Sequence, residues 1–465
     1  MKRFFLSIGL ILLAGWASGN PVGPAEARRN VETFWQQSDC AYRSGVAANE
    51  LTDITSQTDF AHLYIFSNSG GFVILSGDDC AKPILAYSTS GGFDPENIPV
   101  VVRDWLMSYE NRIEQAVNQQ LVATSEISGQ WEMLRSGRWI DSRKTETVDP
   151  LVSAQWGQGS PYNALCPPNT PVGCIAVAMG QIMHYWQYPE HGTGSHSYSS
   201  NGYTHDVDFS SATYDYSAMP NSCSSANNAV ATLLYHCGVA IETLYASGNS
   251  TAYVLNTASH PYNAESAMKE FFGYSSEAYG VRRVMYTKAA WMEMLKSNLN
   301  EGIPIIYNGF NSSNSGGHCF ICDGYDANDF FHFNWGQKGS YDGFFEIDDM
   351  TPANQDFSHD QGAILGLVPI TDTPTEGIAD RGRSNQKLHV YPNPTSGVTL
   401  VECKGANMGS CSFRVYDGFG KLLESGDLTK ENNTIDLTGR PNGIYFLHLI
   451  EGGKMVSVEK IVKVR

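Results

Sequence analysis

The chain has 465 residues, enough for about three domains at roughly 150 residues each. Asp and Glu number 48 against 30 Lys and Arg, and the resulting formal net charge of −18 argues against a nucleic-acid-binding protein. A hydrophobic content of 42% suits a packed globular protein, and 10 cysteines are too few for a disulfide-rich scaffold. After the N-terminus, no apolar run approaches the ~20 residues that cross a bilayer.

The N-terminus has the residue order of a secretory signal peptide. Lys2 and Arg3 give a positive start, residues 4–14 are largely apolar, and residues 16–20 are mostly small and polar. This order predicts a signal peptide over residues 1–19. A short membrane anchor is the alternative, but the stretch is short for a span and no basic stop-transfer patch follows. The mature protein is therefore expected to leave the cytoplasm, where disulfides are permissible.

Residues 20–148 are predicted to form a separate small α+β unit with a linker. The expected elements are strands at 61–66, 72–76 and 84–88 and a helix within 99–120. A turn cluster with two glycines separates the first two strands, which predicts a hairpin. Residues 122–149 are polar and charged, so we expect an exposed linker and a target for proteolysis there.

The stretch around Cys174 is the most informative for chemistry. Pro171 and Gly173 interrupt the chain just before it, and an apolar stripe then recurs at helical spacing, formed by Ile175, Ala178, Met179 and Ile182. Cys174 is therefore predicted to begin a buried helix. The partial positive charge at a helix N-terminus favours a thiolate and lowers the thiol pKa. A small core cysteine without chemistry is the alternative.

Two later segments offer partners for such a nucleophile. His318 lies where a glycine-rich loop enters an apolar strand, 144 residues after Cys174, which is a spacing expected for a papain-like pair. Asn334 follows 16 residues later at the end of another predicted strand, and its side-chain oxygen can accept the imidazole N–H. Trp335 can cover that bond and exclude water. Each of these residues alone is more often structural.

An oxyanion donor is expected from the loop before the helix. Gln155 and Gln158 lie in a glycine-loosened segment, and the side-chain amide of either residue could act with the backbone N–H of Cys174. Residue type does not separate the two, and a surface glutamine is the alternative for each.

Taken together, these residues occur in the chain order of papain-clan cysteine peptidases, and the chain resembles the streptopain family over about residues 20–370. The motifs that carry the resemblance are Gln-Gly-Ser-Pro-Tyr-Asn (158–163), Gly-Cys-Ile-Ala (173–176), Gly-Gly-His (316–318), His-Phe-Asn-Trp-Gly (332–336) and Asp-Gly-Phe-Phe (342–345). Residues 71–78 and 87–94 are similar to the pro-segment of the same peptidases.

The resemblance implies a role for each candidate. The family's catalytic residues fall on Cys174, His318 and Asn334, and its oxyanion glutamine falls on Gln158 rather than Gln155. It also implies an inhibitory pro-domain that covers the active site until it is cut off, and a preference for an apolar residue two positions before the cleaved bond. Two departures from the family pattern, Gln337-Lys338 and Cys319, put that preference in doubt.

The C-terminal part changes character near residue 370. Residues 371–386 read as a linker, and residues 387–465 contain short alternating runs that predict a small β-sandwich. Tyr-Pro-Asn-Pro (391–394), Val-Tyr-Asp (415–417) and Asn-Gly-Ile-Tyr (442–445) resemble the sorting domain of type IX secretion cargo. The resemblance implies export across the outer membrane of a Gram-negative bacterium. An ordinary β-sandwich binding module is the alternative.

Other cysteine chemistry is a rival interpretation. Cys319 and Cys322 have a minimal zinc-ligand spacing with His318 and His332 nearby, but an offset of three in a strand points the two thiols to opposite faces. The sequence leaves undecided whether disulfides join Cys40 with Cys80, Cys403 with Cys411, or two of Cys166, Cys223 and Cys237.

The sequence thus predicts an α+β protein. Its parts are a signal peptide (1–19), a pro-domain with linker (20–148), a papain-like catalytic domain (149–370), a linker (371–386) and a sorting domain (387–465). The expected function is a secreted or outer-surface cysteine endopeptidase made as a zymogen, with an inactive surface adhesin as the alternative. Protein or peptide substrates, its own pro-domain and the secretion machinery are the expected partners. No nucleic acid, membrane span, metal or cofactor is expected.

Overall fold

A computed structural model describes residues 19–464 except 39, 140–145, 258, 311–316, 348–360, 371–386, 394, 405–410, 418–421, 429–431 and 452–453. The signal-peptide prediction therefore lies almost wholly outside the described residues. The chain divides into two compact units. The first comprises Met1–Thr147, Asn311–Gly316 and Tyr325–Asp356, and the second comprises Val148–Phe310, Gly317–Gly324 and Phe357–Arg465.

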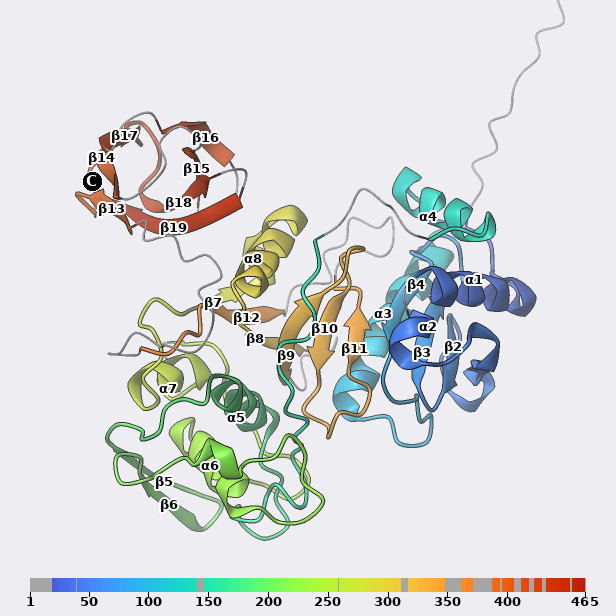
Figure 1. Ribbon diagram of the computed structural model, residues 1–465, viewed down its shortest axis with the longest axis horizontal. Helices are drawn as coiled ribbons and strands as arrows, with labels where there is room; N and C mark the ends of the chain where they lie inside the picture. The colour runs from blue at the N-terminus through green and yellow to red at the C-terminus, as the bar shows by residue number, and fades with distance from the viewer. Residues whose placement is uncertain are drawn as a thin grey trace, which may run out of the picture. The chain divides into compact units, whose positions relative to one another are not determined.

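The first unit is an antiparallel sheet with helices on both faces (Figure 1). Its strands run in the order β1 (Thr52–Asp53), β2 (Leu63–Asn68), β3 (Gly71–Ser76), β4 (Ile84–Ser88), β11 (Gly343–Phe345) and β10 (Phe331–Asn334). Its helices are α1 (Pro24–Gln37), α2 (Cys40–Ser44), α3 (Val100–Asn118) and α4 (Ser125–Arg135). The predicted hairpin is confirmed as β2 and β3, which pair antiparallel around a two-residue turn between Asn68 and Gly71.

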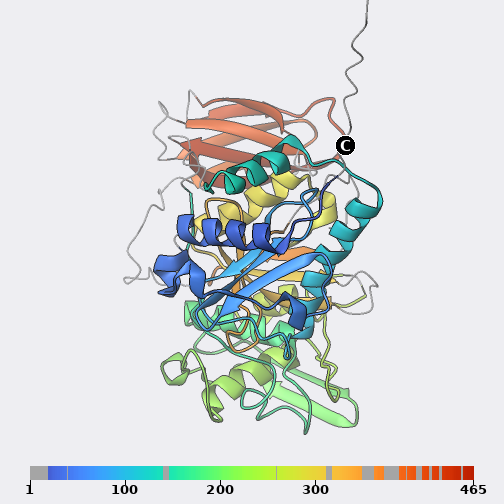
Figure 2. The same cartoon turned by 90° about the vertical axis from the view of Figure 1, so that its right-hand side faces the viewer.

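Alternation along β11 explains the two faces of this sheet. Phe344 stacks on Tyr87 of β4 within the core that α1 and α4 cover, and Figure 2 shows α1 lying across these strands. Phe345 points the other way and stacks on Phe333 of β10, where Trp105 of α3 packs edge-on.

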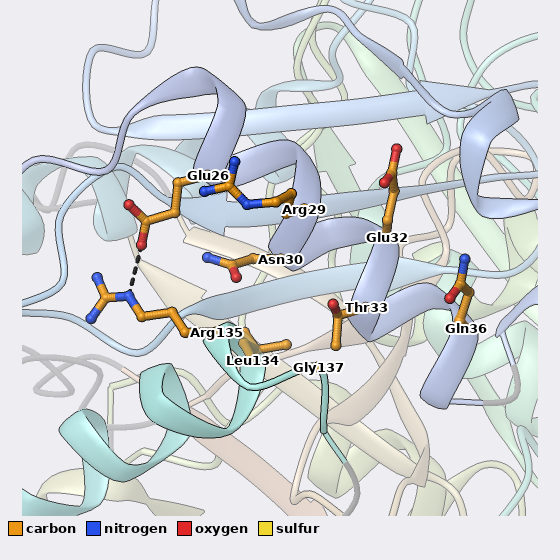
Figure 3. A pocket seen from close by; sticks show the side chains of 9 residues that line it. All are labelled: Glu26, Arg29, Asn30, Glu32, Thr33, Gln36, Leu134, Arg135 and Gly137. Atoms are coloured by element: carbon orange, nitrogen blue, oxygen red, sulfur yellow. Dashed lines mark hydrogen bonds and ion pairs between the residues drawn. The ribbon is translucent and has the colours of Figure 1, made fainter.

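The expectation of an exposed linker over residues 122–149 is wrong for residues 125–135, which form α4. Thr124 caps this helix by accepting the backbone N–H of Ile127, and an apolar stripe at helical spacing is buried, namely Ile127, Trp131 and Leu134. Trp131 donates its indole N–H to the carbonyl of Ala81 at 2.7 Å. Arg135 reaches Glu26 of α1 at 2.7 Å (Figure 3). The helix was not predicted because its overall composition is polar, although three of its apolar residues lie on one face.

The second unit contains a helical cluster and a smaller antiparallel sheet. The sheet runs in the order β9 (Gly317–Tyr325), β8 (Ile305–Phe310), β12 (Gly362–Leu365) and β7 (Tyr279–Arg282), and a separate hairpin is formed by β5 (Ser195–Ser200) and β6 (Tyr203–Asp208). The helices are α5 (Cys174–Trp186), α6 (Asn228–Ala240), α7 (Ala264–Glu270) and α8 (Lys288–Asn300). One core contains both α5 and inward side chains of the sheet, including Ile306, Cys319, Ile321 and Ile364.

The C-terminal residues form two small sheets, which confirms the predicted sandwich. One sheet contains β13 (Lys387–Tyr391), β14 (Val398–Lys404) and β17 (Asn432–Asp436), and the other contains β16 (Leu422–Asp427), β15 (Cys411–Asp417), β18 (Gly443–Glu451) and β19 (Lys454–Lys463). Their shared core includes Val401, Val415 and Leu447. A disulfide between Cys403 and Cys411 was one of two open alternatives, as a staple across a hairpin. Strands β14 and β15 belong to different sheets and form no such hairpin, and the side chains of these two cysteines lie outside the described residues.

Candidate active site

Cys174 is the first residue of α5, as the sequence predicts. Gly173 precedes it with a φ of 98°, a conformation that glycine adopts readily, and the carbonyl of Gly173 accepts the N–H of Val177. The rest of the helix is buried from Ile175 to Met183. Core packing therefore fixes α5 and holds the half-buried Cys174 at its N-terminus.

The sulfur of Cys174 lies against backbone N–H groups of two elements. The backbone N–H groups of Cys319 in β9, of Ile175 and of Cys174 itself lie close enough to the sulfur to favour its charged form. Burial raises the pKa of Cys174, and these N–H groups lower it by less. The expectation of a lowered pKa is thus wrong for this form of the protein, because desolvation of the thiolate outweighs the helix N-terminus.

His318 is the second residue of β9 and is half-buried at the edge where the strand begins, which confirms the predicted loop–strand position. It pairs with Gly309 of β8. Further along, Asp323 accepts the N–H of Val152 at 2.8 Å, which fixes the buried part of the strand. Because the N–H of the next residue, Cys319, contacts the sulfur of Cys174, the start of β9 and the start of α5 meet.

Gln158 lies on a loop that is attached to α5. Its carbonyl accepts the N–H of Val172 at 2.9 Å, two residues before Cys174. Nearby, Trp156 donates its backbone N–H to the buried side chain of Gln181 in α5 at 2.9 Å. Gln158 is half-buried, whereas Gln155 is exposed. The second unit therefore brings Gln158, Cys174 and the strand of His318 together.

Asn334 and Trp335 belong to the first unit, at the end of β10. Asn334 is buried and accepts the N–H of Gly336 with its side-chain oxygen. Trp335 is also buried, and it donates its backbone N–H to Asp342 and its indole N–H to the carbonyl of Tyr341. These bonds lock the predicted polar-aromatic-glycine turn in one conformation. The roles of both residues stay predictions.

The sequence did not reveal how the N-terminal segment (the described residues before 148) is attached to the strand pair β10–β11. Strand β4 pairs antiparallel with β11, matching Tyr87 with Phe344. Lys82 and Glu346 form an ion pair at 2.8 Å with both side chains nearly buried. The sequence feature that could have revealed this ion pair is Glu346, the one carboxylate in the apolar run from Phe344 to Ile347. A carboxylate buried in such a run needs a cation beside it.

A second missed contact joins Tyr87 to Asp326. The Tyr87 hydroxyl donates to the Asp326 carboxylate at 2.8 Å. Burial raises the pKa of Asp326 to about 6, although backbone N–H groups and the Tyr87 hydroxyl oppose the shift. The β4–β11 pairing, the Lys82–Glu346 ion pair and the Tyr87–Asp326 hydrogen bond together hold residues 82–88 against residues 326–346.

The structure also bears on the rival cysteine chemistry. None of the eight cysteines whose side chains are described forms a disulfide, so neither a Cys40–Cys80 bridge nor a pairing among Cys166, Cys223 and Cys237 is present. Within the part of the chain that the structure describes, no group of three His, Cys, Asp or Glu residues could hold a metal ion. No described helix is long and apolar enough to cross a bilayer.

Three protein families match separate parts of the chain. Residues 19–113 match the Spi protease inhibitor, residues 156–345 match the Peptidase C10 family, and residues 389–464 match the secretion system C-terminal sorting domain. The sorting domain marks the chain as a secreted or outer-surface protein.

Individual relatives agree with these matches. The chain is 26% identical over 423 residues to the thiol protease/hemagglutinin PrtT of Porphyromonas gingivalis, covering 85% of this chain and 46% of PrtT. It is 27% identical over 412 residues to streptopain of Streptococcus pyogenes, covering 78% of this chain and 98% of streptopain.

A solved structure of a related pro-form has a similar fold. A fragment of prointerpain A from Prevotella intermedia, solved as a cysteine-to-alanine mutant, is 29% identical with a TM-score of 0.55, covering 69% of this chain and 99% of that fragment. The predicted fold class, a papain-like peptidase domain preceded by an α+β segment, is thereby confirmed. The chain therefore contains a cysteine peptidase domain of the Peptidase C10, or streptopain, family, with an inhibitor-like segment before the peptidase domain and a sorting domain after it.

Proposed function

We propose that this chain is the zymogen of a secreted cysteine endopeptidase. Cys174 attacks the peptide carbonyl as a thiolate, and the backbone N–H of Cys174 with the side chain of Gln158 stabilises the oxyanion. The His318 imidazolium donates its proton to the leaving amine. It then takes a proton from the water that hydrolyses the thioester, and the thiolate is regenerated. Asn334 orients the imidazole, and Trp335 shields that contact from water.

The observation that carries this proposal is the meeting of α5 and β9. A sulfur at a helix N-terminus lies close to the backbone N–H of the residue that follows His318. The only covalent chemistry required is that of a thiol and an imidazole, and both come from rigid elements.

The N-terminal segment supplies latency in this proposal. Strand β4 pairs with β11, and Lys82 forms a buried ion pair with Glu346. Both contacts support the proposal that the segment stays bound to β10–β11 until it is cleaved. A raised pKa of Cys174 supports a nucleophile that is held as the unreactive thiol in this form. We propose that the signal peptide spans residues 1–19, the pro-domain 20–148 and the catalytic domain 149–370.

The test compares three full-length proteins after controlled removal of the N-terminal segment. Wild type is expected to cleave fluorogenic peptides, Cys174→Ala is expected to be inactive with an unchanged circular dichroism spectrum, and Cys223→Ala, which changes a half-buried loop cysteine, is expected to match wild type. Peptide cleavage by folded Cys174→Ala at the wild-type rate would overturn the proposal. A folded, processed wild type that cleaves no peptide would favour the inactive adhesin.

A further inference from the structure

A pocket of about 360 Å³ lies in the second unit, outside the residues discussed so far. Its lining includes Glu242, Leu244, Thr251, Tyr253, His260 and Tyr262. These residues come from the chain between α6 and α7. Its volume falls in the range of a site for one large side chain or a small ligand.

The pocket wall continues into the loop that touches the N-terminus of α5. Leu244 and Thr251 pair as a short antiparallel bridge. Next to this bridge, Ser250 donates its hydroxyl to the carbonyl of Pro171 at 2.7 Å. The carbonyl of Ser250 lies 3.5 Å from the position that a Cβ on Gly173 would occupy. The pocket is therefore adjacent to the segment that presents Cys174.

The walls are aromatic and aliphatic. Tyr253 and His260 stack with ring centroids 3.5 Å apart and an interplanar angle of 12°. At the rim, Leu244 and Tyr253 are 48% and 49% exposed, so their apolar surface is accessible to a ligand. Such walls accept the methylene stem of a long side chain, and a ring face attracts a cation.

Glu242 is the one carboxylate among the described residues that line the pocket. One of its oxygens lies 3.1 Å from Nε2 of His196, and the His196 ring packs on Tyr262 at 4.2 Å. The carboxylate is therefore held in place by a neighbour that is itself packed. Its side chain is still 40% exposed, so its remaining lone pairs are accessible to a ligand.

We propose that this pocket binds the side chain of a Lys or Arg residue of the substrate, near the scissile bond. The stem lies between Tyr253 and the aliphatic walls, and the cationic head meets Glu242. This inference rests on the proposed function and names a substrate preference for it. It concerns a different substrate position from the apolar preference that the family resemblance implies, and the chain's net charge of −18 also favours basic substrates.

The test uses processed enzyme and fluorogenic peptides in which each position near the cleaved bond carries Arg, norleucine or Glu in turn. At one position, we expect kcat/KM for Arg to exceed that for norleucine by about tenfold, the size of a partly desolvated ion pair with a ring contact. Glu242→Gln is expected to reduce this ratio to about twofold or less, through a loss of kcat/KM for the Arg peptide. Glu242→Lys is expected to reverse the preference toward Glu.

Glu190→Gln is the matched control, since the Glu190 side chain is 80% exposed and outside the pocket, and it is expected to leave the ratio as in wild type. Equal cleavage of the Arg and norleucine peptides at every position by wild type would overturn the inference, as would a preference for Arg that survives in folded Glu242→Gln. Either result leaves the peptidase activity itself in place. Failure of the proposed function would appear instead as a processed wild type that cleaves none of the peptides.

Discussion

The buried ion pair of Lys82 with Glu346 predicts a large and asymmetric cost when one partner is removed. The two side chains are only 10% and 2% exposed, and the nitrogen–oxygen distance is 2.8 Å. Lys82→Met keeps the stem of the side chain but leaves the Glu346 carboxylate without this cation in a desolvated position. Breaking such a pair typically costs about 3–5 kcal/mol, which is a large share of the stability of a domain.

The assay is urea unfolding of the full chain in a Cys174→Ala background, which prevents self-processing. Lys82→Met is expected to lower the unfolding free energy of the first unit by about 3–5 kcal/mol, and Lys82→Met with Glu346→Gln is expected to recover part of the loss. In the catalytically competent chain, Lys82→Met is expected to start self-processing earlier, because the N-terminal segment is held less tightly.

The matched control is the exposed ion pair of Arg103 with Asp59, whose side chains are 41% and 63% exposed. Arg103→Met is expected to change the unfolding free energy by no more than about 1 kcal/mol, since solvent screens an exposed pair. If Lys82→Met and Arg103→Met unfold at the same urea concentration, the buried pair does not anchor the segment and the reasoning is refuted.

Three further predictions concern pH and catalysis. Burial raises the pKa of Asp326 to about 6, so the protonated carboxyl stabilises the folded state below the ordinary Asp range, and this stabilisation is lost as the pH rises through 6. The first unit should therefore resist urea better at pH 4 than at pH 7, with up to about 3 kcal/mol of the unfolding free energy coming from this group. Asp326→Asn should make the unfolding free energy less dependent on pH. Gln158→Ala should lower kcat by about a hundred- to a thousandfold in single-turnover assays, whereas an unchanged kcat would exclude its amide from the oxyanion site. Asn334→Ala should be milder, at about ten- to a hundredfold in kcat/KM, because Asn334 orients the imidazole and carries no proton; a loss equal to that of Cys174→Ala would contradict this role.

The parts of the fold that follow from local pattern were predictable. The hairpin of β2 and β3 follows from two apolar runs around a glycine-bearing turn, and the position of Cys174 follows from Gly173 and the apolar stripe behind it. The terminal sandwich follows from short strands separated by turns. In each case, one short window of sequence contains both the element and its boundary.

What could not be predicted depends on partners that are distant in the chain. The direction of the Cys174 pKa shift is set by burial of the thiol in the folded, unprocessed chain, which no local pattern reports. The pairing of β4 with β11 joins residues more than 250 positions apart, and Lys82 gave no sign of its partner Glu346. Helix α4 was not predicted because the residues that it buries, Ile127, Trp131 and Leu134, are spread through a mostly polar stretch.

The central claim, that Cys174 is the nucleophile, is tested most directly by the pH dependence of alkylation with iodoacetamide, followed by peptide mapping. In the unprocessed chain, we expect Cys174 to react slowly and only at a pH above the ordinary thiol range, because burial raises its pKa. After processing, the peptide that contains Cys174 should be labelled first, at neutral pH, and activity should fall in proportion to its label. Full activity in a protein whose Cys174 is completely alkylated would contradict the account.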